Sequence, residues 1–186
     1  MAAFLPFAVL VSLLAAGATA DNGYTTPTTP SPQQAPATPP PQSDKLLVRV
    51  EGLVLCQSCA HRNSWSLDGA APLPGAKVTV TCRDGKNRVM AWRAATADES
   101  GYFLAEFGVT AITDFFTGDP RKACFVRLLA SPDFKCNLLT NVNSGLEGAP
   151  LRDEDKRWPG QGYDNVVYAA GPLAFRPATC VPTHHY

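Results

Sequence analysis

Six cysteines are the residues of this sequence whose type and spacing bear most directly on chemistry. They are Cys56, Cys59, Cys82, Cys124, Cys136 and Cys180, and the first two form a C-x-x-C motif. A thioredoxin-type redox pair needs this motif at the start of a helix, and a zinc site needs more ligands at short spacing. No helical pattern follows Cys59, and the later cysteines are isolated. We therefore expect each cysteine of the motif to bond to a distant partner, and we expect no metal site.

The common signatures of catalysis are missing. The sequence has no G-x-S-x-G elbow, no H-E-x-x-H motif and no glycine-rich phosphate loop. A triad would need His61, His184 or His185, and the last two stand near the chain end, where order is usually poor. A hydrolase with two catalytic carboxylates is the remaining enzymatic hypothesis, but 16 acidic residues single out no pair. We predict a protein that is not an enzyme, with no catalytic residue and no cofactor.

Aromatic side chains are the candidates for stacking on sugar rings. The tryptophans and tyrosines considered are Trp65, Trp92, Trp158, Tyr163 and Tyr168. Packing in the core is the competing role of such side chains, and we expect it for Trp92, which lies within a strand pattern. Trp158 and Tyr163 lie in a glycine-rich stretch instead. These two are therefore the predicted glycan contacts.

An export signal precedes the elements that position these residues. Residues 4–16 are almost uninterrupted apolar residues, and Ala18-Thr19-Ala20 supplies the small side chains that signal peptidase accepts. The apolar run is shorter than the roughly 20 residues that span a bilayer. We predict a signal peptide over 1–20, cleavage before Asp21, secretion, and no membrane anchor after cleavage. In an oxidising compartment the six cysteines predict three disulfides, but sequence physics does not choose the pairing.

A proline-rich arm is predicted over residues 21–43. It holds seven of the 17 prolines and almost no aliphatic side chains, so it cannot bury enough surface to offset its ordering entropy. We expect a disordered, extended arm. If the source is a plant, its Thr-Pro, Ser-Pro and Ala-Pro steps are candidate sites of O-glycosylated hydroxyproline. These candidates are Pro27, Pro30, Pro32, Pro36 and Pro39.

Residues 44–186 have the length and the pattern of one β-rich domain. Alternation of apolar and polar residues, or short apolar runs between turn residues, predicts strands over 46–55, 76–82, 89–94, 102–107, 124–130 and 173–175. Short strands between Gly and Pro turns favour an all-β fold, a small disulfide-stapled barrel or sandwich. Residues 109–116 are a candidate for one or two turns of helix. The polar, glycine-containing stretch 137–171 is predicted to be a long loop, with the charged run 153–157 as a solvated turn.

The formal net charge of the chain is zero, which bears on its partners. A nucleic-acid binder would normally carry a basic excess on one element, so we expect no nucleic-acid partner. A net charge of zero likewise gives no electrostatic reason to expect attraction to anionic membranes, although a few basic residues can still form a local patch.

Four stretches, taken in order, resemble the pollen Ole e 1 allergen and extensin family. The closest likeness within it is to the cysteine-containing C-terminal domain of arabinogalactan, proline-rich and pistil-specific extensin-like proteins. The stretches are 50–59 (VEGLVLCQSC), 72–82 (opening PLPGAKV), 136–149 (Cys136 and then TNVNSGLEGA) and 171–180 (GPLAFRPATC). Together they span nearly the whole predicted domain.

The resemblance implies a β-barrel or sandwich with the disulfides Cys56–Cys136, Cys59–Cys180 and Cys82–Cys124. It also implies a non-enzymatic cell-wall protein that binds pectic galactan or arabinogalactan O-glycans, so the expected partner is a wall polysaccharide or glycoprotein. The arm is shorter than an extensin backbone and lacks Ser-Pro-Pro-Pro-Pro repeats, so we expect a glycosylated spacer rather than a cross-linking segment. The alternative is a secreted ligand or inhibitor that acts on a protein partner.

Overall fold

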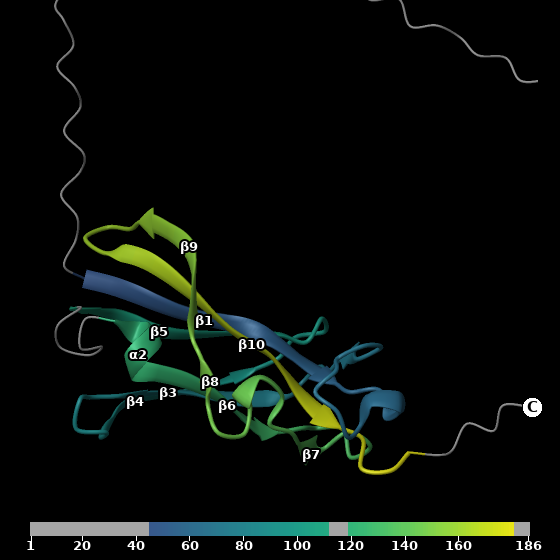
Figure 1. Ribbon diagram of the computed structural model, residues 1–186. Coiled ribbons are helices and arrows are strands. Elements are labelled where there is room, and N and C mark those ends of the chain that lie inside the picture. Colours follow the sequence, from purple (N-terminus) through teal and green to yellow (C-terminus); the bar gives the residue numbers. More distant parts are fainter. Residues whose placement is uncertain (1–44, 112–118, 181–186) are drawn as a thin grey trace, which may run out of the picture. The chain divides into compact units, whose positions relative to one another are not determined.

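The computed structural model describes residues 45–111 and 119–180 (Figure 1). The predicted signal peptide, the proline-rich arm with its candidate hydroxyprolines, and the two C-terminal histidines lie outside the described residues. Backbone contacts divide the chain into the units Met1–Pro39 and Pro40–Tyr186. All of the described residues belong to the second unit.

Two β-sheets form the layers of this unit, with the core between them (Figure 1). The first sheet contains β1 (Lys45–Cys56), β2 (Ala71–Pro72), β5 (Tyr102–Ala111), β7 (Leu138–Leu139), β9 (Arg152–Pro159) and β10 (Asp164–Arg176). The second sheet contains β3 (Lys77–Arg83), β4 (Val89–Thr96), β6 (Cys124–Ala130) and β8 (Ala149–Pro150), in the order β4-β3-β6-β8. This arrangement is a β-sandwich and confirms the predicted all-β, disulfide-stapled fold class.

The long strands β1 and β10 form the centre of the first sheet. They run parallel and pair from Leu46 opposite Asp164 to Cys56 opposite Phe175. Along its other edge, β1 pairs with β5 over most of its length and with the short β2 at its end. Along its other edge, β10 pairs with β9 over its first half and with the short β7 at its end. Because β10 is covered on both faces for most of its length, its sequence is nearly continuous in apolar residues.

The core is filled by side chains that alternate along the strands of both sheets. Val48, Val50 and Val54 of β1 are fully buried, as are Val78 and Val80 of β3. The intervening residues of β1 point to the opposite side of the first sheet, because successive side chains of a strand alternate between faces. That alternation leaves the outward side of the first sheet free to carry polar and aromatic groups.

Most of the predicted strands correspond to observed ones. The ranges 46–55, 76–82, 89–94, 102–107 and 124–130 fall in β1, β3, β4, β5 and β6, in that order. The predicted strand 173–175 is the end of the much longer β10. The candidate helix over 109–116 is wrong at its start, because residues 109–111 continue β5. Its other residues lie outside the described part of the chain.

The predicted loop over 137–171 is wrong for much of its length. It contains all of β9 and the first part of β10, which form an antiparallel pair. The charged run 153–157 lies in strand β9 and not in a turn, although most of its side chains are solvated. The physical reason is that β9 pairs on one side only, with β10. Charged side chains suit such an edge strand, and they hide the alternation that would mark it in the sequence.

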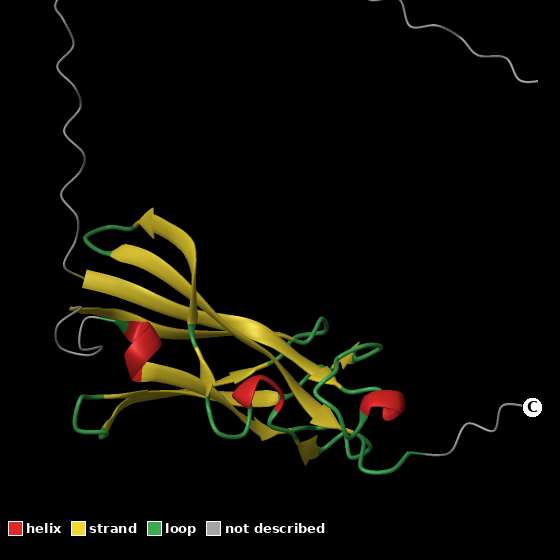
Figure 2. Ribbon diagram, in the orientation of Figure 1, coloured by secondary structure: helices red, strands yellow, loops and turns green. Residues whose placement is uncertain are grey.

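Within the described residues, helical structure is confined to single turns at strand connections (Figure 2). They are η1 (Cys59–His61), α2 (Pro120–Ala123) and η2 (Val142–Ser144). The Asp119 side chain accepts a hydrogen bond from the backbone N–H of Arg121 and caps α2, which places a proline at its first position. Over residues 45–111 and 119–180, no helix has the length and apolar character needed to cross a membrane.

Candidate sugar-binding surfaces

Three disulfides hold the described unit together. The bonds are Cys56–Cys136, Cys59–Cys180 and Cys82–Cys124, which are the pairs that the family resemblance implies. Each cysteine of the C-x-x-C motif bonds to a residue far along the chain, 80 and 121 positions away. In the described residues no cysteine is free, and no group of three His, Cys, Asp or Glu side chains could hold a metal.

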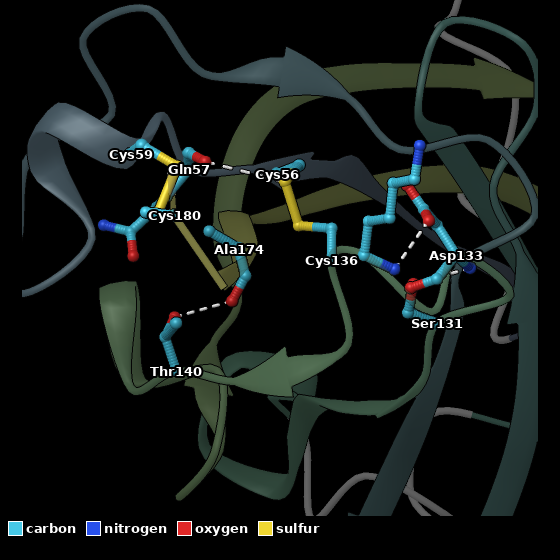
Figure 3. The surroundings of a disulfide bond; sticks show 10 residues. Cys56, Gln57, Cys59, Ser131, Asp133, Cys136, Thr140, Ala174 and Cys180 are labelled. Atoms are coloured by element: carbon cyan, nitrogen blue, oxygen red, sulfur yellow. Dashed lines mark hydrogen bonds between the residues drawn. A yellow bond between two sulfur atoms is a disulfide. The ribbon is translucent and has the colours of Figure 1, made fainter. Parts of the chain in front are cut away.

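Gln57, inside the C-x-x-C motif, fixes the loop that follows it. Gln57 is 2% exposed, and the disulfides Cys56–Cys136 and Cys59–Cys180 lie on either side of it in the sequence (Figure 3). The side-chain Nε2 donates hydrogen bonds to the carbonyl oxygens of Ser64 and Ser66, both at 3.0 Å. A buried amide with both donors satisfied is costly to displace, so the loop has one preferred conformation.

This loop forms one wall of a pocket of about 370 Å³, which we call the Trp65 pocket. The side chains from the loop that line it are Arg62, Asn63 and Trp65. The other wall comes from Asn141 and its neighbours and from Arg176 at the end of β10. Trp65 is 71% exposed, so its indole is accessible at this pocket.

Hydrogen bonds to the backbone hold the second wall. Thr140 Oγ1 donates to the carbonyl oxygen of Ala174 on β10 at 2.6 Å (Figure 3). Asn141 Oδ1 accepts from the backbone N–H groups of Leu146 and Glu147. The pocket is therefore built from two fixed segments, beside the two disulfides of the C-x-x-C motif.

A second candidate surface lies on the outward side of the first sheet. We call it the Trp158 face, and its members are Arg49, Glu51, Tyr102, Glu106, Lys156 and Trp158. Trp158 is 42% exposed, and Arg49 Cζ lies 5.3 Å from the centroid of its ring. The side-chain amide of Asn165 donates to the carbonyl oxygen of Trp158 at 3.2 Å. A cation over the ring and a bond to the backbone both orient the indole on the sheet.

The charges of the Trp158 face are paired across strands. Arg49 contacts Glu106 at 2.9 Å, and the Lys156 ammonium contacts Glu51 at 2.7 Å. The Tyr102 hydroxyl donates to the other oxygen of Glu51 at 2.8 Å. Exposed ion pairs contribute about 0–1 kcal/mol each, so these pairs matter more for ordering the surface than for stability.

The pairing shifts the titration of three groups on this face. Burial raises the pKa of Glu51, but hydrogen bonds from Lys156 and Tyr102 outweigh that effect and hold the pKa below its ordinary value. The hydrogen bond to Glu51 raises the pKa of Lys156. Burial, and then the Glu51 carboxylate, raise the pKa of Tyr102 to about 12. At neutral pH the face therefore carries a carboxylate, an ammonium and a neutral phenol.

A shallow cavity of about 200 Å³ extends the Trp158 face. Glu51 and Tyr102 line it, together with Arg152 and Glu154 from β9 and with Pro172 from β10. Arg152 Nη1 donates to the carbonyl oxygen of Gly171 at 2.9 Å, which fixes one side of this cavity. The face and the cavity together offer hydrogen-bond donors and acceptors beside an aromatic ring.

The predicted glycan contacts Trp158 and Tyr163 have different surroundings. Trp158 lies on the outward side of the sheet, as described above. Tyr163 lies in the turn between β9 and β10, where its carbonyl accepts from the backbone N–H of Gly160 at 2.7 Å. Its ring packs so closely on Gly160 that an added Cβ there would come within 2.4 Å of it. Tyr163 is half-buried, and its ring shapes the turn.

The other aromatic candidates divide between core and surface. Tyr168 is 4% exposed and belongs to the core. The expected core position of Trp92 is wrong, because this residue is 52% exposed. The reason is that β4 turns Ala91 and Ala95 inward, so Trp92 points outward. Trp65 is among the aromatic candidates but not among the two predicted glycan contacts. Arg62 and Arg176 are not candidates, since nothing in their spacing along the sequence shows that they meet.

Searches against known proteins place the chain among plant wall proteins. It is 31% identical over 145 residues to non-classical arabinogalactan protein 30 of Arabidopsis thaliana, covering 74% of this chain and 55% of that protein. It is 33% identical over 141 residues to the pistil-specific extensin-like protein of Nicotiana tabacum, covering 72% and 31%. Proline-rich protein 3 of Arabidopsis thaliana is 30% identical over 144 residues, covering 74% and 40%. The chain thus matches about half or less of the length of these relatives.

The chain was also compared with protein-family models and with solved structures. No protein-family model matches the chain. Among solved structures, the crystal structure of the major plantain pollen allergen Pla l 1 aligns with a TM-score of 0.49 and 18% identity. That alignment covers 75% of this chain and 99% of the allergen chain.

Proposed function

This chain belongs to the pollen Ole e 1 allergen and extensin family, and on that premise we propose that it is a non-enzymatic wall protein whose β-domain binds neutral sugar chains. The protein is secreted and extracellular, as its arabinogalactan and extensin-like relatives are. The ligand classes we propose are pectic galactan and the O-glycans of arabinogalactan proteins. The galactose units of galactan, and the galactose and arabinose units of arabinogalactan, carry no charge.

The observation that carries this proposal is the exposed Trp158, whose ring has the Arg49 guanidinium over it at 5.3 Å. An aromatic face is a good surface for the C–H groups of a sugar ring because it is apolar and already ordered. The ring is oriented before binding, so little side-chain entropy is lost when a sugar stacks on it.

The polar groups around Trp158 suit sugar hydroxyls. Glu51, Glu106 and the Tyr102 hydroxyl oxygen provide acceptors, and Arg49 and Lys156 provide donors. Two cations and two carboxylates balance, so this face has no preference for a charged polymer. The face also lacks a nucleophile and base pair of the kind that catalysis needs.

The wider organisation of the chain is part of the proposal. We assign residues 1–20 to a signal peptide, 21–43 to a proline-rich arm and 44–186 to the sugar-binding β-domain. The arm acts as a spacer, with Pro27, Pro30, Pro32, Pro36 and Pro39 as its hydroxyproline glycosylation sites.

A panel of wall polysaccharides tests this function. The mature chain is applied to immobilised pectic galactan, arabinogalactan and xylan, beside the variants Trp158→Ala and Trp92→Ala. We expect retention on galactan or arabinogalactan, loss of retention for Trp158→Ala, and no change for Trp92→Ala, whose exposed indole lies on the other sheet. Retention on none of the polymers would contradict the proposal.

The alternative function, a secreted ligand or inhibitor of a protein, is tested by a pull-down from wall extract. Recovery of a partner protein in stoichiometric amount, unaffected by glycanase treatment, would favour this alternative.

A further inference from the structure

We infer that the Trp65 pocket binds a carboxylate-bearing sugar, of the uronic acid class. This site is separate from the Trp158 face and differs from it in charge. The inference rests on the proposed function in one respect only, namely that the ligand is a sugar chain.

The first observation is the charge of the pocket. Arg62 and Arg176 line it, and none of its lining residues is an Asp or a Glu. The Trp158 face balances its cations with carboxylates, whereas this pocket does not. Since the whole chain has no net charge, the positive potential here is local and does not reflect a basic protein.

The second observation is that these arginines have unused donors. In the part of the chain that the structure describes, the Nε atoms of Arg62 and Arg176 are buried without a hydrogen-bond partner. Arg62 Nη2 donates to the carbonyl oxygen of Ala178 at 2.9 Å, which orients its guanidinium. A buried donor without an acceptor is unfavourable, so a ligand oxygen that displaces the atoms covering these donors would offset part of that cost.

The shape of a guanidinium selects the kind of acceptor. A guanidinium presents pairs of parallel N–H groups, and each pair matches the two oxygens of a carboxylate. The hydroxyl of a neutral sugar offers a single oxygen and no charge. Two arginines in a pocket without acidic side chains therefore favour a carboxylate over a hydroxyl.

The remaining lining favours a sugar acid over a simple anion. Trp65 presents a largely exposed indole, on which the apolar face of a sugar ring can stack. Asn63 adds an exposed amide that can pair with ring hydroxyls. The buried amide of Gln57 holds the backbone of this loop at two points, so the site is ordered before it is occupied.

The test compares one ligand in two charge states. A short oligogalacturonide and its methyl ester share the same rings and differ in the charge of the carboxyl group. Titration calorimetry with the mature chain at low salt should show tighter binding of the acid form, weakening as salt is added. Arg176→Gln should weaken binding of the acid by roughly ten- to a hundredfold, the value of a charge-assisted hydrogen bond. Arg93→Gln, which changes an exposed arginine on β4, is the matched control and should bind normally.

Several results would overturn the inference. They are equal affinity for the acid and its ester, unchanged affinity of Arg176→Gln, or equally tight binding of an aspartate-rich peptide. If Arg176→Gln does not fold, Arg176→Lys keeps the charge but loses the two-donor edge, and it should bind the acid with intermediate affinity. Trp65→Ala should weaken binding of both ligand forms.

The two proposals fail in different ways. Trp158→Ala should leave oligogalacturonide binding unchanged, while Arg176→Gln should leave galactan binding unchanged. Binding of the acid alone would refute the neutral site at Trp158 and support this one. Binding of galactan alone would do the reverse.

Discussion

Glu51 is the residue on which the order of the Trp158 face depends most. It accepts from Lys156 of β9 and from Tyr102 of β5, so one carboxylate links strands on both sides of β1. Its lowered pKa makes this link stabilising above the unfolded-state pKa of about 4.3, and the stabilisation is lost as pH falls through the lower folded value. The face should therefore keep its arrangement over the mildly acidic range.

Tyr102 provides a test of this network at the opposite end of the pH scale. Its folded pKa of about 12 lies above the unfolded value of about 10. The associated stability is thus fully present below about pH 10 and is lost as pH rises through about 12. In the difference between ultraviolet titrations of the native chain and Tyr102→Phe, we expect a phenol that ionises near 12. A difference curve centred near 10 would mean that Tyr102 is neither buried nor bonded to Glu51 as the structure has it.

At the scale of elements, β1 contains a close approach that admits only glycine. The register between β1 and β10 shifts between Gly52 and Val54. A Cβ at Gly52 would lie 2.3 Å from the carbonyl oxygen of Ala170 and 2.8 Å from the ring of Phe103. Neither neighbour can move easily, because one is backbone and the other is fully buried.

We therefore predict that Gly52→Ala lowers the free energy of unfolding by about 2–3 kcal/mol, the usual cost of overpacking. Denaturant unfolding with intact disulfides measures the change. Gly85→Ala is the matched control, because a Cβ there would meet nothing within 4 Å. Its effect should stay within about 0.5 kcal/mol. Equal stability of Gly52→Ala and the native chain would show that β1 and β10 do not approach as closely as described.

The Cys82–Cys124 bond joins neighbouring strands of the second sheet. The two residues lie directly opposite each other on β3 and β6. Their separation of 42 residues predicts a stabilisation of about 4 kcal/mol from loop closure. The double variant Cys82→Ala/Cys124→Ala should therefore unfold at a lower denaturant concentration while keeping its β-sheet circular dichroism. A variant that shows no loss of stability would contradict a closed bond at this place.

Elements were predictable from sequence where apolar and polar side chains alternate along a strand. Val78 and Val80 fill the core, whereas Thr79 and Thr81, although also buried, lie on the other face of β3, and this alternation marks the strand. The hairpin of β9 and β10 gave no such alternation. One of its strands is a charged edge, and the other is covered on both faces. The apolar run 166–170 was the available signal for β10, but the surrounding glycines and charges concealed it.

The candidate sites were predictable only in part, because each combines residues that are far apart in the sequence and are brought together by the whole fold. Trp158 could be selected by type, since exposed aromatics in polar surroundings favour binding. The contact between Trp158 and Arg49 could not be predicted. It arises because only β10 lies between β9, which carries Trp158, and β1, which carries Arg49. Arg62 and Arg176 meet at one pocket because the C-terminal ends of the parallel strands β1 and β10 lie side by side, next to two disulfides.

The disulfide pairing is a second property of the whole molecule. The residues alone left the pairing open, and the structure has the pairs that the family resemblance implies. Peptide mapping of the secreted protein without reduction should recover Cys56 linked to Cys136 and Cys59 linked to Cys180. A peptide with Cys56 bonded to Cys59 would contradict this arrangement, and with it the architecture of the Trp65 pocket.

The central claim is that the β-domain binds neutral wall sugars at the Trp158 face. The most direct measurement is a calorimetric titration of the mature chain and of Trp158→Ala with soluble galactan and arabinogalactan fragments, with Trp92→Ala as control. The account predicts measurable binding of one neutral polymer by the native chain and by Trp92→Ala. It predicts a loss of roughly tenfold or more for Trp158→Ala, since aromatic contacts contribute about 1–1.5 kcal/mol or more when a ring is covered. Equal affinity of the native chain and Trp158→Ala, or no heat with any neutral fragment, would contradict it.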